Sequence, residues 1–214
     1  MNLIVFDIDG TLTDSVKVHI NAFLIALKQL GVKEEGFNFK TYKHHTDSYI
    51  SKVIYEEYVQ KEFTSEVQEQ FASILYSEIN KHEIKEIKGA SQLIQSLQKD
   101  ENYGICYATG SIIQPAKLKL EVVGASYDPS QLVPSNDIYE RENIVSKAIE
   151  NAKEFYQVEQ FDKIYSIGDG LWDLKTAQNL ELEFIGIGEE NEAIMRENGM
   201  QTFYKDLTEF ELPL

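Results

Sequence analysis

The stretch NLIVFDIDGTLTDS, residues 2–15, places a short apolar run directly before a group of acidic residues. Residues 2–6 are rich in branched apolar side chains, which is typical of a strand buried in a parallel sheet. Asp7 and Asp9 follow this run, and Gly10 permits a tight turn after them. Because ligands bind beyond the carboxyl ends of strands in open α/β sheets, the stretch predicts both a fold class and the place of a site.

The later part of the chain alternates between strand-like and helix-like patterns. Further strands are predicted at residues 103–108, 163–167, 183–187 and 201–204. Helices are predicted at residues 90–99, 115–123, 143–156, 171–180 and 192–198. This alternation indicates an α/β fold, in which helices cover both faces of a parallel, Rossmann-like sheet.

A long insertion separates the first predicted strand from the second. Apolar residues recur in it at helical spacing, which predicts helices at residues 19–30, 48–59 and 66–79. Helices in this number can form a small bundle with its own core. We therefore expect an α/β core made of residues 1–15 and 89–214, and a helical domain made of residues 16–88.

Charge and composition exclude several classes of function. The 214 residues include 20 basic and 36 acidic side chains, so the net charge is −16. This balance disfavours nucleic acid and anionic membranes as partners, because the surface cannot neutralise their phosphates. No apolar run reaches the roughly 20 residues of a membrane helix. The first strand begins directly after Met1 and Cys106 is the one cysteine, so we expect a cytoplasmic protein. We also expect a monomer or a weak dimer.

Two neighbouring carboxylates at a strand end suit phosphoryl transfer. One can attack phosphorus and become an aspartyl-phosphate, while the other protonates the leaving oxygen and then activates water. A turn or a helix cap would use the same residue types. A calcium loop is excluded, because it would require glycine at the position of Leu12 and glutamate at the position of Val18.

A second acidic group follows another predicted strand, in the stretch SIGDGLWD at residues 166–173. Asp169 and Asp173 would bring the number of carboxylates to four, although a capped helix start would use the same residues. Four carboxylates with few basic partners predict a hard divalent cation. Mg²⁺ fits best, because it also binds substrate phosphate. We expect Trp172, within this stretch, to serve packing rather than substrate stacking.

Phosphate also requires hydrogen-bond donors. Thr109, Gly110 and Ser111 follow the predicted strand at residues 103–108, at the start of a helix. Their N–H and O–H groups can form a small anion-binding cradle. A simple helix cap has the same composition, and for the tripeptide alone it would be preferred.

A phosphoryl-transfer site also needs positive charge beyond a metal ion. The candidates are Lys117, Arg141 and Lys147, and we favour Arg141 because it lies just before the helix predicted at residues 143–156. The polar cluster KHHTD at residues 43–47 could contact a leaving group. A capped helix start, with a residue of this cluster as the cap, is the slightly favoured interpretation.

In this order, DIDGTLTDS, ATGS, a basic residue and GDGLWD resemble the four motifs of the haloacid dehalogenase superfamily of phosphohydrolases. The resemblance covers the whole chain. It implies a HAD-like α/β core, in which residues 16–88 correspond to the α-helical cap of the phosphoglycolate phosphatase and β-phosphoglucomutase branch. The dehalogenases themselves attack carbon and need no metal, so the intact acidic set favours chemistry at phosphorus.

The resemblance also implies roles for the four aspartates. Asp7 would be the nucleophile and a metal ligand. Asp9 would be the general acid/base, with its backbone carbonyl on the metal. Asp169 and Asp173 would hold the Mg²⁺ ion, the latter through water.

For the phosphate, the resemblance implies that Thr109 binds the transferring group with help from the Gly110 amide. Arg141 would replace the lysine usual in the family, and Lys147 is the other candidate for that place. The expected activity is magnesium-dependent hydrolysis of a small phosphorylated metabolite through an aspartyl-phosphate. A phosphomutase acting on a sugar phosphate and a non-catalytic binding protein on the same fold are the alternatives.

Overall fold

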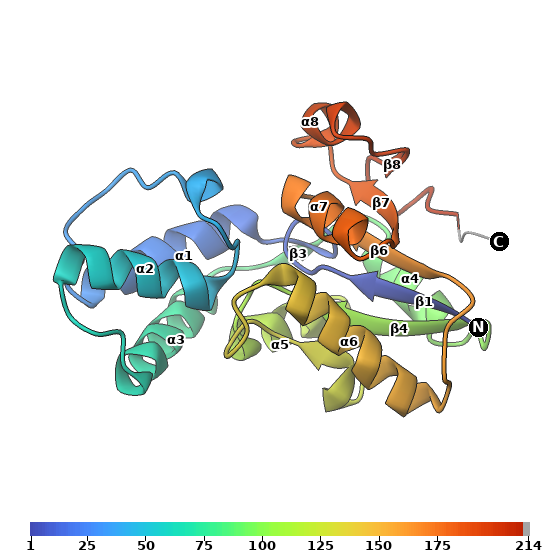
Figure 1. The fold of residues 1–214 in the computed structure, drawn as a ribbon, viewed down its shortest axis with the longest axis horizontal. Helices are drawn as coiled ribbons and strands as arrows, with labels where there is room; N and C mark the ends of the chain where they lie inside the picture. Colours follow the sequence, from blue (N-terminus) through green and yellow to red (C-terminus); the bar gives the residue numbers. More distant parts are fainter. Residues whose placement is uncertain (212–214) are drawn as a thin grey trace.

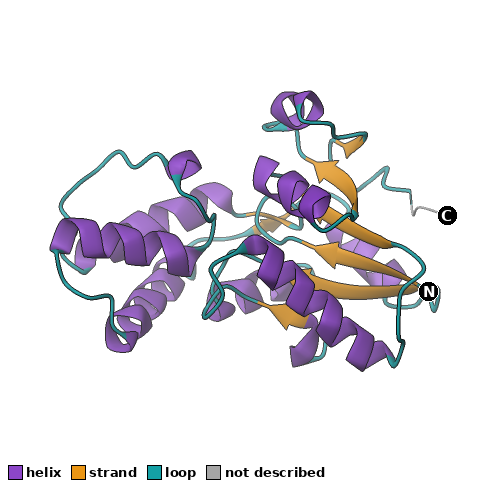
Figure 2. Ribbon diagram, viewed as in Figure 1, coloured by secondary structure: helices purple, strands orange, loops and turns teal. Residues whose placement is uncertain are grey.

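The computed structural model describes residues 1–211, and its main sheet has six parallel strands (Figures 1 and 2). The strand order is β5-β4-β1-β6-β7-β8. The strands are β1 (Asn2–Phe6), β4 (Tyr103–Ala108), β5 (Leu132–Val133), β6 (Ile164–Gly168), β7 (Glu183–Ile187) and β8 (Thr202–Tyr204). The parallel α/β sheet is therefore confirmed. The sequence did not predict β5, because two residues are too few for a periodic pattern.

Helices cover both faces of this sheet. They are α4 (Ala90–Leu97), α5 (Ile113–Val122), α6 (Arg141–Tyr156), α7 (Leu171–Asn179) and α8 (Glu192–Glu197), with a short 3₁₀ turn at Pro129–Gln131. Alternate residues of β1 point to opposite faces. Ile4 and Phe6 share a core cluster with residues of α4 and α5, whereas Leu3 and Val5 pack with residues of α6.

The insertion after β1 forms a separate group of helices, drawn in blue to teal at the left of Figure 1. It contains α1 (Val16–Gln29), a 3₁₀ turn (Phe39–Thr41), α2 (Asp47–Val59) and α3 (Ser65–Ile79). These helices bury their own apolar cluster, which includes Phe23, Phe71 and Leu75. An antiparallel pair, β2 (Thr13–Asp14) and β3 (Lys85–Glu86), joins the insertion to the core. The inserted helical cap is confirmed, whereas its expected limits at residues 16 and 88 remain a prediction.

We use "cap" below for α1 to α3 and the segments that connect them.

The structure keeps Cys106 buried inside β4. Among the helices within residues 1–211, none has both the length and the apolar character that crossing a bilayer requires.

Candidate active site

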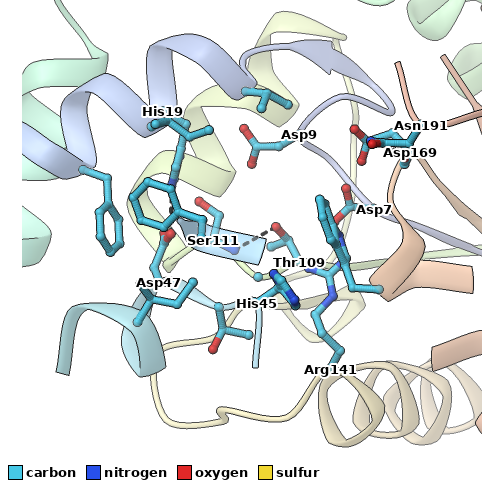
Figure 3. Close-up of a pocket in the computed structure, with 18 of the residues that line it drawn as sticks. Asp7, Asp9, His19, His45, Asp47, Thr109, Ser111, Arg141, Asp169 and Asn191 are labelled. Atoms are coloured by element: carbon cyan, nitrogen blue, oxygen red, sulfur yellow. Dashed lines mark hydrogen bonds and ion pairs between the residues drawn. The ribbon is translucent and has the colours of Figure 1, made fainter. Parts of the chain in front are cut away.

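Three loops converge at the carboxyl edge of the sheet because β1 lies between β4 and β6. The loop after β1 carries Asp7, the loop after β4 carries Thr109, and the loop after β6 carries Asp169. Figure 3 shows these three side chains around one cavity. The strand order thus brings together groups that lie far apart in the chain.

The turn after Asp7 is tight, and it depends on Gly10. Gly10 has a φ of +79°, and its N–H donates to the carbonyl of Thr13 at 2.8 Å. A Cβ atom at this position would lie 2.2 Å from Oδ2 of Asp169. Glycine is therefore required twice, for the left-handed backbone and for the close approach of the second acidic loop.

Three carboxylates of the site lie close enough to share a cation. Asp7, Asp169 and Asp173 each offer an oxygen, and these oxygens lie within 4.8 Å of one another. Burial, followed by the charge of Asp173, raises the pKa of Asp7 to about 7. Burial and the charges of Asp173 and Asp7 also raise the pKa of Asp169 well above its usual value. This donor set, all oxygen and mutually repelling, suits a hard divalent cation.

Arg141 lies inside the same acidic group. It is the first residue of α6, and its Nη2 donates to Oδ1 of Asp7 at 3.1 Å and to Oδ1 of Asp173. The guanidinium is buried, so its charge acts at low effective dielectric. A buried arginine beside Asp7 provides the positive charge that a bound phosphate would need.

Thr109 and Gly110 form the side of the site that faces the cap. The Oγ1 of buried Thr109 accepts from the Ser111 N–H at 3.0 Å, which leaves its own O–H proton able to donate to a ligand. A Cβ atom on Gly110 would lie 2.5 Å from the carbonyl oxygen of His45 and 2.7 Å from Nη1 of Arg141. Glycine is therefore needed where core, cap and arginine meet.

A buried lysine outside the set of predicted site residues contacts Asp9. Lys119 in α5 is fully buried, and its Nζ lies 2.6 Å from the Asp9 carboxylate. The same Nζ lies 2.8 Å from Nδ1 of His19 and 3.4 Å from Oγ of Ser111. Burial alone would raise the pKa of Asp9, but the charge of Lys119, supported by His19, outweighs this and lowers it.

The contact continues from Lys119 into the cap. Nδ1 of His19 accepts from Lys119, so Nε2 carries the proton and donates to Oδ1 of Asp47 at 2.8 Å. Oδ2 of Asp47 accepts from the Ile112 N–H at 3.0 Å. A chain of polar contacts therefore runs from Asp9 through Lys119 and His19 to the first turn of α2.

The other two candidate cations do not lie in the cavity. Lys147 is six residues beyond Arg141 in α6, which places it about 9 Å along and about 240° around the helix. Its side chain is half-exposed and pairs with Glu150 at 3.8 Å, so Lys147 is corrected to a surface residue. Lys117 is likewise exposed.

The sequence does contain a signal that Lys119 is buried, since it shares the apolar face of α5 with Ala116 and Leu120.

The polar cluster at residues 43–47 faces the cavity through three of its members. His45, Thr46 and Asp47 line the cavity, and the ring of His45 stacks on Trp172 with centroids 4.9 Å apart. Thr46 is at the N-cap position of α2 but makes no side-chain cap, and its Oγ1 instead donates to the Tyr139 carbonyl at 3.0 Å. The favoured interpretation of a capping side chain is thus wrong. Trp172 packs against a side chain of the protein, and it also lines the cavity.

The cap is docked on the core and covers one side of the cavity, which remains partly open to solvent. The Asp47 N–H donates to the Gly110 carbonyl at 2.8 Å, and Nε2 of Gln68 donates to the Asn136 carbonyl at 2.7 Å. The volume of the cavity is about 250 Å³. The core side is lined by Asp7, Asp9, Asp169, Thr109 and Arg141, and His19 and Asp47 lie on the cap side in Figure 3.

Comparison with known proteins relates this arrangement to one family. A model of the haloacid dehalogenase-like hydrolase family matches residues 4–187, which is most of the chain. That range includes every residue of the site described above. No curated protein sequence matches the chain.

Solved structures agree with the family match over nearly the full length. CbbY from Rhodobacter sphaeroides, solved in complex with phosphate, has a TM-score of 0.73 at 16% identity, covering 97% of this chain and 95% of the other. A protein proposed to be a β-phosphoglucomutase, from Bacteroides vulgatus, has a TM-score of 0.71 at 15% identity, covering 97% and 84%. A predicted phosphoglycolate phosphatase from Haemophilus somnus has a TM-score of 0.64 at 15% identity, covering 96% and 94%. At these identities the likeness shows the fold alone.

Proposed function

The chain belongs to the haloacid dehalogenase-like hydrolase family, and on this premise we propose that it is a magnesium-dependent phosphatase acting on a small phosphorylated metabolite. One observation carries the proposal. Asp7 and Asp9 line the same cavity as Thr109, beside carboxylates close enough to share a cation. A nucleophile, an acid/base and phosphate-binding groups therefore lie within reach of one bound molecule.

In the first step, an oxygen of Asp7 forms a bond to phosphorus while the bond from phosphorus to the leaving oxygen breaks. Asp9 gives its proton to that leaving oxygen. Arg141 and the hydroxyl of Thr109 hold the phosphoryl oxygens. In the second step water attacks phosphorus, Asp9 takes the proton from this water, and Asp7 is released as a carboxylate.

Asp9 is better prepared for the second step than for the first. The lowered pKa leaves it ionised at neutral pH, which suits a base. For the first step it must gain a proton, and a phosphomonoester with a second pKa near about 6 can bring one into the site. Lys119 then holds the carboxylate in the same place for both steps.

We propose Mg²⁺ as the cation, held by Asp7, Asp169 and Asp173 and by the Asp9 carbonyl. Bound there, it would supply positive charge that lowers the repulsion between the carboxylates and a phosphate. The protein as a whole is acidic, with a net charge of −16, so a local reversal of the field is needed before an anionic substrate can approach.

Metal removal tests this function directly. Hydrolysis of p-nitrophenyl phosphate by the purified protein is expected to stop when EDTA is added and to return with excess Mg²⁺, because the carboxylates repel the substrate without a cation. Released p-nitrophenol measures the rate, and excess Ca²⁺, which prefers more ligands at longer distances, is the control. Activity that persists after dialysis against EDTA would refute the metal dependence.

The affinity for Mg²⁺ should depend on pH. Below about pH 7 the metal-free protein keeps a proton on Asp7, whose pKa is raised to about 7 by burial and by Asp173. Mg²⁺ must displace this proton, and the raised pKa of Asp169 adds to the competition, so its Kd should weaken at least about tenfold for each pH unit below 7. Calorimetric titration with Mg²⁺ between about pH 5.5 and pH 8.5 measures the slope. A Kd that does not change over this range contradicts the raised pKa.

A further inference from the structure

The cap side of the cavity is mainly apolar. Val16, Ile20 and Phe23 line it from one face of α1, since residues at this spacing lie above one another on a helix. Phe39 and Ile50 complete the same wall. The leaving group of a phosphomonoester would contact this wall, because Asp9, which must reach the leaving oxygen, lies between Asp7 and the cap-side residue His19 in Figure 3.

Three of the four polar side chains of the cap that line the cavity, His19, Thr46 and Asp47, already hydrogen-bond the protein. His19 bonds to Lys119 and Asp47, and Asp47 also accepts from the backbone N–H of Ile112. Oγ1 of Thr46 donates to the Tyr139 carbonyl, and the ring of His45 stacks on Trp172. Hydroxyl groups of a sugar bound against the cap side would lose their water partners and find few replacements there.

The cavity also offers few partners for a charged leaving group. Among the described residues that line the cavity, Arg141 is the sole lysine or arginine, and it already contacts Asp7 and Asp173. Asp47 and Glu190 add negative charge to the lining. A second anionic group, such as a carboxylate, would therefore meet carboxylates rather than a partner.

We propose that the preferred substrate is a phosphomonoester with a compact, uncharged and apolar leaving group, rather than a sugar phosphate or the phosphate of a hydroxy acid. This inference rests on the proposed phosphatase function. The cavity volume of about 250 Å³ lies just below the range of about 300–1,000 Å³ that is usual for small-molecule pockets, which favours a compact leaving group. The apolar wall also disfavours the phosphomutase alternative, which needs a sugar in this space.

The test first compares two phosphate esters of primary alcohols. Both carry a six-membered ring, but only one of the rings bears hydroxyl groups. Cyclohexylmethyl phosphate is expected to have a kcat/KM on the order of 100-fold above that of glucose 6-phosphate, because the apolar wall cannot hydrogen-bond the sugar. 2-Phosphoglycolate should be as poor as the sugar phosphate. An equal or higher kcat/KM for either polar substrate would overturn the proposal.

A matched pair of variants links the preference to the wall. Ile20 lines the cavity and is 37% exposed, and Ile25, on the same helix outside the cavity lining, is 39% exposed. Ile20→Asn should reduce the preference for cyclohexylmethyl phosphate about tenfold, whereas Ile25→Asn should leave it unchanged. Equal ratios in both variants would show that the wall does not select the substrate.

Binding separates this inference from the proposed function. Acetyl phosphate, a small generic substrate, reports whether the protein transfers phosphoryl groups at all. Calorimetric binding of cyclohexylmethyl phosphate and glucose 6-phosphate to Asp7→Asn, with Mg²⁺ present, reports the preference without turnover. If acetyl phosphate is not hydrolysed but the apolar ester binds more tightly, the function fails and the inference stands. If acetyl phosphate is hydrolysed and the two esters bind equally, the inference fails and the function stands.

Discussion

Replacing Asp7 with asparagine is expected to lower kcat by at least about 1,000-fold, because the amide cannot form the bond to phosphorus. Asparagine has the same shape as aspartate, so the cavity should keep its geometry. Rapid quenching of the wild-type protein with substrate, followed by mass spectrometry, should find one added phosphoryl group on the peptide that contains Asp7. Asp7→Asn should show neither the wild-type rate nor the added mass of a phosphoryl group.

The same variant separates loss of chemistry from loss of folding. The pKa of Asp7 is raised to about 7 in the folded protein, from 3.8 as the ordinary value, by burial first and then by Asp173. A raised carboxyl pKa means that the ionised form costs stability, and this cost grows as the pH rises from about 4 to about 7. Metal-free Asp7→Asn should therefore unfold at the same or a higher temperature than the wild type at pH 8. A variant that retains more than about a tenth of the activity would exclude Asp7 as the nucleophile.

Replacing Lys119 with methionine is expected to lower kcat/KM for an alkyl phosphate by about 100-fold to 10,000-fold, the range of general acid catalysis. The reason is positional, since Nζ of Lys119 lies 2.6 Å from the Asp9 carboxylate and ties it to His19. Without this contact the acid is no longer held against the leaving oxygen. For p-nitrophenyl phosphate, whose leaving group needs no proton, the loss should be much smaller.

The difference between the two substrates distinguishes positioning from general damage. A fold defect would reduce both rates by the same factor, so equal losses would rule out this role for Lys119. Lys117→Met is the matched control, because Lys117 lies in the same helix but is exposed. It should keep both rates. Thermal unfolding of both variants shows whether the protein with Lys119→Met remains folded.

Local pattern alone determined much of the fold and part of the candidate site. The apolar run before Asp7 predicts a buried strand, and the strands at residues 103–108 and 164–168 are signalled in the same way. Each signal depends on residues that are neighbours in the chain, where periodicity reports burial. Parallel strands end at one edge of a sheet, so polar residues placed after such strands could be expected to meet.

Tertiary structure decided the contacts that local pattern does not encode. Lys119 and Asp9 are 110 residues apart, and their pairing depends on how α5 packs beneath the cap. The choice of Arg141 over Lys147 depends on where α6 begins and which way its first turn faces the sheet. The apolar wall depends on the closure of α1 over the cavity. These contacts follow from the packing free energy of the whole chain, whereas periodicity reports only which side of each element is buried.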